Sequence, residues 1–128
     1  MKKILPVAVL AALAGVNGTQ AVNVNSDGLG QVLLYPFYTA EGSQDTYINL
    51  VNTTDEYKAV KVRILESMNS QEVLDFNLYL SPQDHWSAVI TASEEGEGAT
   101  IMSGDKSCTV PLAVSEGKVI HFRDFEYQ

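Results

Sequence analysis

The chain has 128 residues, of which 8 are Lys or Arg and 16 are Asp or Glu, so its formal net charge is −8. This acid excess argues against nucleic acids and anionic membrane surfaces as partners, because both are polyanions. The length suits one ordinary domain, and a hydrophobic share of 45% excludes a disordered chain.

Residues 1–21 have the three-part layout of a secretory signal peptide. A basic start at residues 1–3 is followed by an uncharged apolar stretch at residues 4–16 and by a polar exit that ends in the small residue Ala21. The apolar stretch is shorter than the roughly 20 residues that span a bilayer. We therefore expect cleavage after Ala21 and export to the periplasm or the cell exterior. The mature chain, residues 22–128, is expected to form one β-sandwich domain with no membrane span.

The mature chain is predicted to form short β-strands. At residues 58–66 (KAVKVRILE) apolar residues alternate with basic ones, which is the period of a strand with one buried face. A helical period would scatter Lys61 and Arg63 among the apolar residues, so we reject a helix there. The side chains expected to face inward in this strand are Val60, Val62 and Ile64.

Further strands are expected at residues 32–39, 46–52, 73–80, 85–91, 99–102, 107–112 and 119–125. Their expected inward-facing side chains include Leu74, Phe76, Leu78, Leu80, Trp86, Ala88 and Ile90. The segment at residues 32–39 is apolar on both faces and should be buried on both, with an edge or a bulge at Pro36. About eight strands separated by turn residues are typical of an antiparallel β-sandwich, immunoglobulin-like in general architecture.

Cys108 is the single cysteine of the chain. In the oxidising environment that exported proteins meet, cysteines usually occur in pairs. The sequence leaves three interpretations open: a small buried thiol, an intermolecular bridge, or a partner cysteine outside this sequence.

Two candidate metal sites fail on their ligands. Residues 23–28 (NVNSDG) resemble the start of a calcium loop, but its twelfth position, which needs a bidentate carboxylate, is Leu34. A blue-copper site needs two His and a Cys, usually with an axial Met. Here Met102 precedes Cys108 and His121 lies well after it, so the order and spacing do not fit. We therefore expect no cofactor.

No catalytic constellation is visible, so we expect no enzymatic activity. Only His85 and His121 could serve as a general base, and neither is tied by sequence to a nucleophile. The carboxylates of residues 94–98 (EEGEG) are expected to form a solvated acidic loop. Residues 52–54 (NTT) are formally a glycosylation acceptor but consist of ordinary turn formers, and we interpret them as a turn.

Aromatic residues gather in the first third of the mature chain, at Tyr35, Phe37, Tyr38, Tyr47 and Tyr57. Exposed aromatic rings can stack on sugars or anchor a protein partner, which makes Tyr35, Tyr38 and Tyr47 a candidate interaction surface. Core packing and cross-strand pairing would explain the same residues, because aromatic side chains are favoured in strands.

Four stretches resemble a family of uncharacterised secreted bacterial β-rich proteins. They are residues 28–39 (GLGQVLLYPFYT), 50–66 (LVNTTDEYKAVKVRILE), 71–82 (QEVLDFNLYLSP) and 108–111 (CTVP). The resemblance implies export, and it assigns no activity and no site residues. Members of that family are longer, which agrees with residues 22–128 being the N-terminal part of a longer protein.

We therefore expect an exported, non-enzymatic structural or interaction module of the bacterial cell envelope or surface, acting through sheet edges and an aromatic patch. A protein partner or self-association is expected, and carbohydrate is a further candidate ligand. The alternative is a fragment of a secreted carbohydrate-active or other hydrolytic enzyme. An exposed stripe of Tyr35, Tyr38 and Tyr47 beside clustered carboxylates would favour that alternative.

Overall fold

The computed structural model describes residues 24–94, 98–111, 114–115 and 117–123. The chain divides into two units, residues 1–34 and residues 35–128, and all the strands of the described residues belong to the second unit. The predicted signal peptide, residues 1–21, lies outside the described residues. Within the described part of the chain, no helix is long and apolar enough to cross a membrane.

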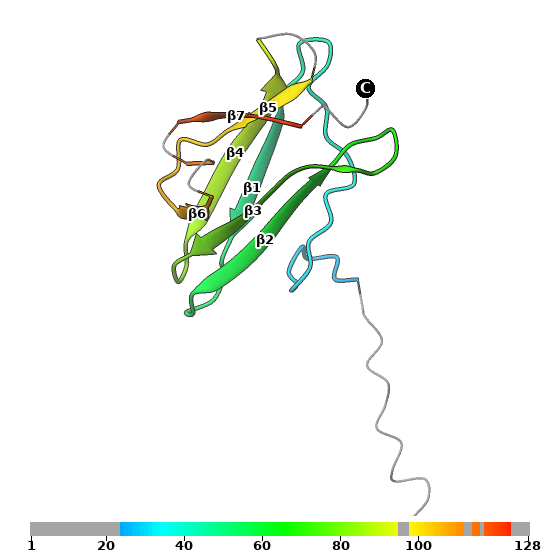
Figure 1. Ribbon diagram of the computed structural model, residues 1–128. Helices are drawn as coiled ribbons and strands as arrows, with labels where there is room; N and C mark the ends of the chain where they lie inside the picture. Colours follow the sequence, from blue (N-terminus) through cyan, green and yellow to red (C-terminus); the bar gives the residue numbers. More distant parts are fainter. Residues whose placement is uncertain (1–23, 95–97, 112–113, 116, 124–128) are drawn as a thin grey trace, which may run out of the picture. The chain divides into compact units, whose positions relative to one another are not determined.

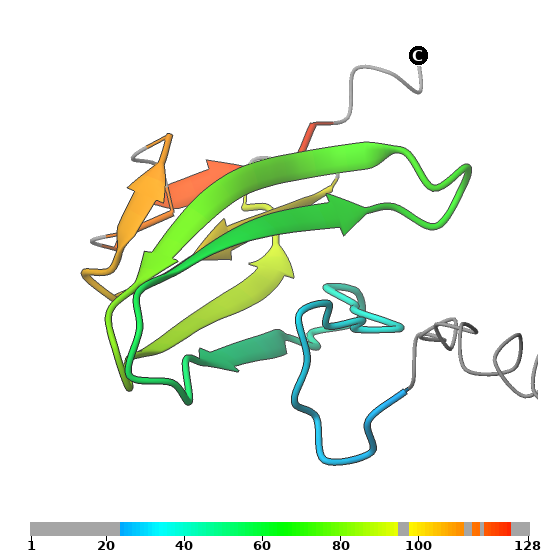
Figure 2. The same ribbon diagram turned by 90° about the horizontal axis from the view of Figure 1, so that it is seen from below.

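Two antiparallel sheets make up the second unit (Figure 1). Sheet A has four strands in the order β1-β4-β5-β7, and sheet B has three in the order β2-β3-β6. The strands are β1 (Thr46–Val51), β2 (Lys58–Leu65), β3 (Glu72–Leu80), β4 (His85–Ala92), β5 (Ala99–Met102), β6 (Cys108–Val110) and β7 (Val119–His121). Figure 2 shows β2 and β3 in one layer and β1 and β4 in the other. The predicted all-β architecture of two antiparallel sheets, consistent with a β-sandwich, is confirmed.

The core lies between the sheets and holds most of the side chains that were predicted to face inward, with Val60 and Val62 only partly buried against it. Val73, Ile101 and Val114 belong to the core without having been predicted. Phe76 of β3 and Trp86 of β4 are almost fully buried, with their ring centroids 5.8 Å apart. Lys61 and Arg63 point outward, as predicted. Burial of a large apolar side chain contributes roughly 1.5–3 kcal/mol, so the period-two pattern fixes the inner face of each strand. The other buried hydrophobic residues are Ile64, Val73, Leu74, Leu78, Leu80, Ala88, Ile90, Ile101 and Val114.

The prediction of a strand at residues 32–39, buried on both faces, is wrong. These residues form no strand, and Val32, Leu34 and Phe37 are 77%, 88% and 77% exposed. Pro36 has no backbone N–H to donate to a ladder. An apolar composition favours a strand only where a partner strand is available, and the composition alone does not supply one.

Residues 35–40 instead follow the edge of β1 through side-chain hydrogen bonds, and we call them the edge segment. The Tyr35 hydroxyl donates to the Asn49 carbonyl over 2.7 Å. The Thr39 N–H donates to Thr46 Oγ1 over 3.0 Å, and the Thr46 hydroxyl donates to the Thr39 carbonyl over 2.8 Å. The side-chain oxygens of Tyr35 and Thr46 thus form hydrogen bonds with the backbone here, whereas a regular β-ladder is formed by backbone groups alone.

Asn52, directly after β1, connects the ends of both sheets. It is buried, and its side-chain amide donates to the carbonyls of Glu56 and Ser81, each over 2.7 Å. Its Oδ1 accepts hydrogen bonds from the N–H and the hydroxyl of Thr54, over 3.1 and 2.8 Å. The turn interpretation of residues 52–54 therefore holds, because the amide nitrogen that a glycan would need is engaged inside the folded chain.

Candidate functional site

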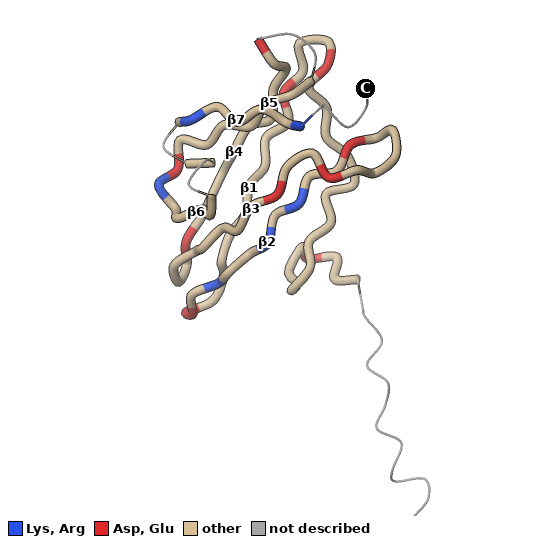
Figure 3. The backbone as a smooth tube through the Cα atoms, viewed as in Figure 1, with Lys and Arg blue, Asp and Glu red and all other residues tan. Residues whose placement is uncertain are grey.

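Charged residues are divided unevenly between the two sheets. The strands of sheet A (TYINLV, HWSAVITA, ATIM and VIH) contain no Asp, Glu, Lys or Arg. In Figure 3 the charge within strands falls on β2 and β3 of sheet B. The charged strand residues are Lys58, Lys61, Arg63, Glu72 and Asp75. Sheet A is thus free of strand residues of these four types in a chain whose net charge is −8.

We call the outward-facing side of sheet A the uncharged face. Along β1, β4 and β7 its outward-facing residues alternate with more buried ones, and in β5 Met102 faces outward. The members are Tyr47, Asn49, Val51, His85, Ser87, Val89, Thr91, Met102, Val119 and His121.

An apolar row crosses the uncharged face from one edge to the other. Strand register places Tyr47 opposite Val89, Val89 opposite Met102, and Met102 opposite Val119. Tyr47 is 73%, Met102 38% and Val119 52% exposed. Side chains opposite each other in antiparallel strands lie about 5 Å apart on the same face. Each of the four strands therefore contributes one apolar side chain to a continuous line.

Neutral polar side chains flank the apolar row on both sides. Asn49 lies opposite Ser87 on one side. On the other side Thr91 and His121 both lie in register with Thr100, which is buried between them. An apolar centre with a polar, uncharged surround resembles the core and rim of a protein interface.

The outer face of sheet B carries a cross-strand ion-pair network instead. Lys61 donates to Asp75 and Arg63 donates to Glu72, while Arg123 Nη2 lies 3.9 Å from Asp75 Oδ1. The hydrogen bond from Lys61 outweighs desolvation and lowers the pKa of Asp75. The hydrogen bond to Glu72 raises the pKa of Arg63. These charges on the sheet B face already have partners within the same molecule.

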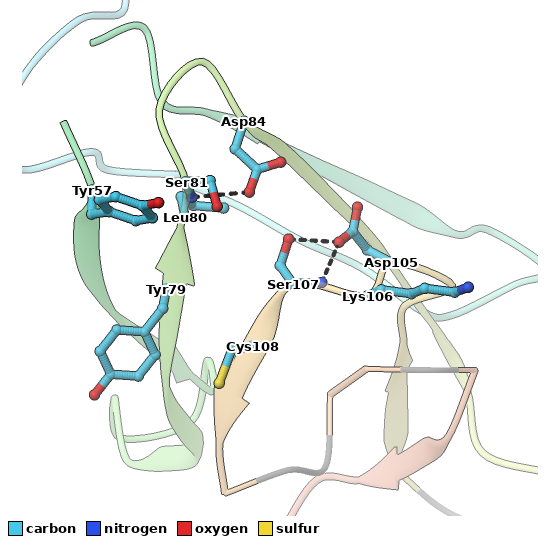
Figure 4. Close-up of a pocket in the computed structure, with 9 residues that line it drawn as sticks. All are labelled: Tyr57, Tyr79, Leu80, Ser81, Asp84, Asp105, Lys106, Ser107 and Cys108. Carbon is cyan, nitrogen blue, oxygen red and sulfur yellow. Dashed lines mark hydrogen bonds between the residues drawn. The ribbon is translucent and has the colours of Figure 1, made fainter. Parts of the chain in front are cut away.

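A shallow, open hollow of about 470 Å³ lies where β3 ends and β6 begins (Figure 4). Tyr57, Tyr79 and Cys108 are among its lining residues. Cys108 lies opposite Tyr79 in the ladder between β3 and β6, and it is exposed. The interpretation of Cys108 as a buried thiol is therefore wrong, because the next residue, Thr109, takes the inward position of this short strand.

The two carboxylates that line the hollow hold the local chain in place. Asp84 accepts hydrogen bonds from the N–H groups of Ser81 and His85, over 3.0 and 2.9 Å. Asp105 accepts from the N–H and the hydroxyl of Ser107, over 2.7 and 2.6 Å (Figure 4). Both carboxylates are thus engaged in turn structure at the rim of the hollow.

The three tyrosines singled out from the sequence lie in different surroundings. Tyr35 stands beside β1 and is more than half exposed. Tyr38 packs against the core, edge-on to Phe122 with 6.0 Å between the ring centroids. Tyr47 lies in the apolar row. The use of these three tyrosines as an interaction surface stays a prediction. Of the three, Tyr47 is the one that lies opposite Val89 in the paired strands β1 and β4.

Selection by aromatic content misses Val89, Met102 and Val119, the rest of the apolar row. The signal that marks Val89 and Met102 is the lack of charge in the strands predicted at residues 46–52, 85–91 and 99–102. The strand predicted at residues 119–125 contains Arg123 and Asp124, so Val119 carries no such signal. The alignment of the apolar row requires three strand pairings, β1 with β4, β4 with β5 and β5 with β7.

The residues considered and rejected as blue-copper ligands lie apart in the fold. His85 and His121 lie on sheet A, and Cys108 lies on sheet B. Across the described ranges, no three His, Cys, Asp or Glu side chains are grouped so that they could hold a metal ion.

Comparisons of the chain with protein-family models, with curated proteins and with solved structures found no match.

Proposed function

We propose that this chain is an exported, non-enzymatic interaction module of the bacterial cell envelope that binds protein through the uncharged face of sheet A. The observation that carries the proposal is the division of charge between the sheets. An apolar row with neutral polar flanks can leave water at little cost, because no charge has to be desolvated. Covering the sheet B face would instead remove paired charges from water, which is expensive.

Export is supported by the leader layout at residues 1–21 and by the resemblance to secreted bacterial proteins. The proposed location is the periplasm or the cell surface. There the chain without residues 1–21 carries a net charge of −8 − 2 = −10, which keeps it soluble, while one uncharged face remains available for a partner.

We limit the immunoglobulin-like comparison to the general two-sheet layout. A constant-type immunoglobulin domain has strand orders A-B-E-D and C-F-G, so its first two strands are paired neighbours. In this chain β1 pairs with β4, and β2 pairs with β3 in the other sheet. The proposed binding mode therefore rests on the charge pattern of sheet A and not on analogy with that fold.

A carbohydrate-active role is the second candidate, and the hollow of sheet B is the feature that favours it. Tyr57 and Tyr79 could stack on a sugar there, close to the carboxylates of Asp84 and Asp105. Both carboxylates accept hydrogen bonds from neighbouring turn residues, which supports a structural role for them. Protein binding through sheet A is the stronger candidate.

Site-specific photo-crosslinking tests the proposal. A photoreactive phenylalanine analogue replaces Tyr47 on the uncharged face or, as the matched control, Tyr57 beside sheet B, which is similarly exposed. The full chain is produced and exported in cells, irradiated, and its adducts are identified by mass spectrometry. We expect protein adducts at position 47 several times more abundant than at position 57. Equal yields, or no adduct at position 47, would contradict the proposal.

A further inference from the structure

We infer that the partner of the uncharged face is a second copy of this chain, packed face to face in a weak, symmetric dimer. This inference rests on the proposed function and names the partner of the same face. It is argued from the charge pattern, the shape and the size of that face.

The charge pattern favours a second copy. A partner with a charged contact surface would find no counter-charge in the strands of sheet A and would lose hydration without compensation. A second uncharged face meets the requirement directly. Two copies that meet there keep the charged residues of their strands, all in sheet B, on the far sides of the pair.

The shape of the apolar row suits a two-fold arrangement. In such a dimer the same patch is used by both copies, so it must be complementary to itself. The row runs straight across the four strands, from Tyr47 at the β1 edge to Val119 at the β7 edge. Two sheets that pack about 10 Å apart at roughly 30° bring two such rows across each other at Val89 and Met102.

The size of the face limits the strength of the dimer. Four strands about 4.8 Å apart, with 6, 8, 4 and 3 residues at about 3.4 Å per residue, give a face of roughly 14 by 18 Å. This footprint of about 250 Å² is well below the 800 Å² or so that each partner buries in a stable complex. We therefore infer a reversible dimer that forms at high local concentration rather than a permanent one.

Salt should strengthen this dimer. Cleavage after Ala21 removes Lys2 and Lys3, so each exported copy carries a net charge of −8 − 2 = −10, and two copies repel each other at long range. The Debye length falls from about 30 Å at 0.01 M salt to about 10 Å at 0.1 M, which screens that repulsion. The contact itself holds no ion pair that salt could weaken. An interface built on the charged sheet B face would respond in the opposite direction.

Sedimentation velocity of the exported protein, purified from producing cells, tests the inference. Loading concentrations run from about 10 to about 500 µM, which covers weak affinities. Met102→Lys places a charge in the centre of the apolar row. Val110→Lys is the matched control, because Val110 is a similarly exposed apolar residue on sheet B. Both variants change the net charge of the exported chain equally, from −10 to −10 + 1 = −9, so long-range repulsion is the same in both.

We expect the sedimentation coefficient of the unmodified protein to rise with concentration, and to rise further at higher salt. Met102→Lys should weaken association at least tenfold, and Val110→Lys should leave it unchanged. Tyr47→Lys, at an exposed edge position, provides a second variant should Met102→Lys fail to fold. A monomer under all conditions, association that salt weakens, or an equal loss in Val110→Lys would overturn the inference. Crosslinks from position 47 to a different protein would overturn the second copy as partner while leaving the proposed function in place.

Discussion

The outer faces of the two sheets differ in their content of charged side chains. The sheet B face holds Lys61, Asp75 and Arg63 in a cross-strand network, whereas the strands of sheet A carry no Asp, Glu, Lys or Arg. Both faces enclose the same apolar core, so core packing does not explain the difference. A charged, internally paired face is stable in water. An uncharged face with an apolar row can give up its water, and it is therefore the face suited to binding.

The two long edge strands differ in the same way. β2, at the edge of sheet B, carries Lys58, Lys61 and Arg63, and such charges discourage pairing with foreign strands. β1, at the edge of sheet A, carries none and is followed instead by the edge segment, which includes Pro36. The edge of sheet A is thus covered by the edge segment, whereas the edge of sheet B is protected by charged side chains. The outer face of sheet A stays uncharged.

The largest effect is expected in the core that both faces share. Phe76→Ala should lower the free energy of unfolding by about 3–5 kcal/mol, because it leaves a cavity beside Trp86. Asn77→Ala, on the outward face of the same strand, serves as the control and should change it by less than about 1 kcal/mol. Urea unfolding followed by tryptophan fluorescence measures both. Similar losses in the two variants would break the assignment of inner and outer faces.

The next effect concerns the connection between the sheets. Asn52→Ala should lower the free energy of unfolding by about 2 kcal/mol, because the carbonyls of Glu56 and Ser81 lose their donor. Thr53→Ala, at the exposed neighbouring position, should be nearly neutral. The same urea experiment distinguishes them. A neutral Asn52→Ala would show that the sheets are held together without this residue.

A smaller effect, confined to sheet B, is expected in acid. Because the pKa of Asp75 is lowered in the folded chain, its carboxylate adds stability above its ordinary value of 3.8, and this is lost as the pH falls further. Asp75→Asn should therefore be less stable than the unmodified chain at pH 7, and the difference should close in acid. Asp45→Asn removes the same charge at an exposed position before β1. Thermal unfolding between neutral pH and acid measures the difference, and a gap that widens in acid would contradict the ion-pair account.

The smallest effect on folding is expected on the uncharged face itself. Met102→Lys should alter the free energy of unfolding by less than about 1 kcal/mol, because the side chain is partly exposed and the lysine ammonium can reach water. If Met102→Lys folds normally and yet fails to self-associate, the uncharged face of sheet A contributes to binding and not to folding. A large loss of stability would instead show that Met102 belongs to the core.

The local sequence pattern was sufficient to predict the strands that have one buried face. It was insufficient for segments whose structure depends on which strand they pair with. The alternation of Val60, Val62 and Ile64 with basic residues identifies both the strand and its inner side. Residues 32–39 have an equally strong strand composition, but a strand also needs a neighbour with free backbone groups. For Cys108, general burial tendencies pointed inward, whereas register with Tyr79 places it outward. Register is a property of paired strands and cannot be read from one of them.

The candidate site likewise depends on features that one strand's sequence shows and on strand pairing that it does not show. The lack of charge in the predicted strands that correspond to β1, β4 and β5 is visible in the sequence, whereas the strand predicted at residues 119–125 contains Arg123 and Asp124 and is uncharged only within the shorter β7. Their assembly into one sheet depends on the pairing of β1 with β4, which are separated by the whole β2–β3 hairpin. Tyr47 was identified from its aromatic ring, while its neighbour Val89 became recognisable only through this pairing.

Oxidative footprinting of the protein in its producing cells tests the central claim most directly. Tyr47 of sheet A and Tyr57, directly before β2 of sheet B, are well matched probes, because they are 73% and 80% exposed. If the uncharged face is the binding face, Tyr47 should be oxidised several times more slowly in cells than in dilute purified protein, while Tyr57 should react alike in both. Equal rates for Tyr47 in the two settings, or protection of Tyr57 instead, would contradict the account.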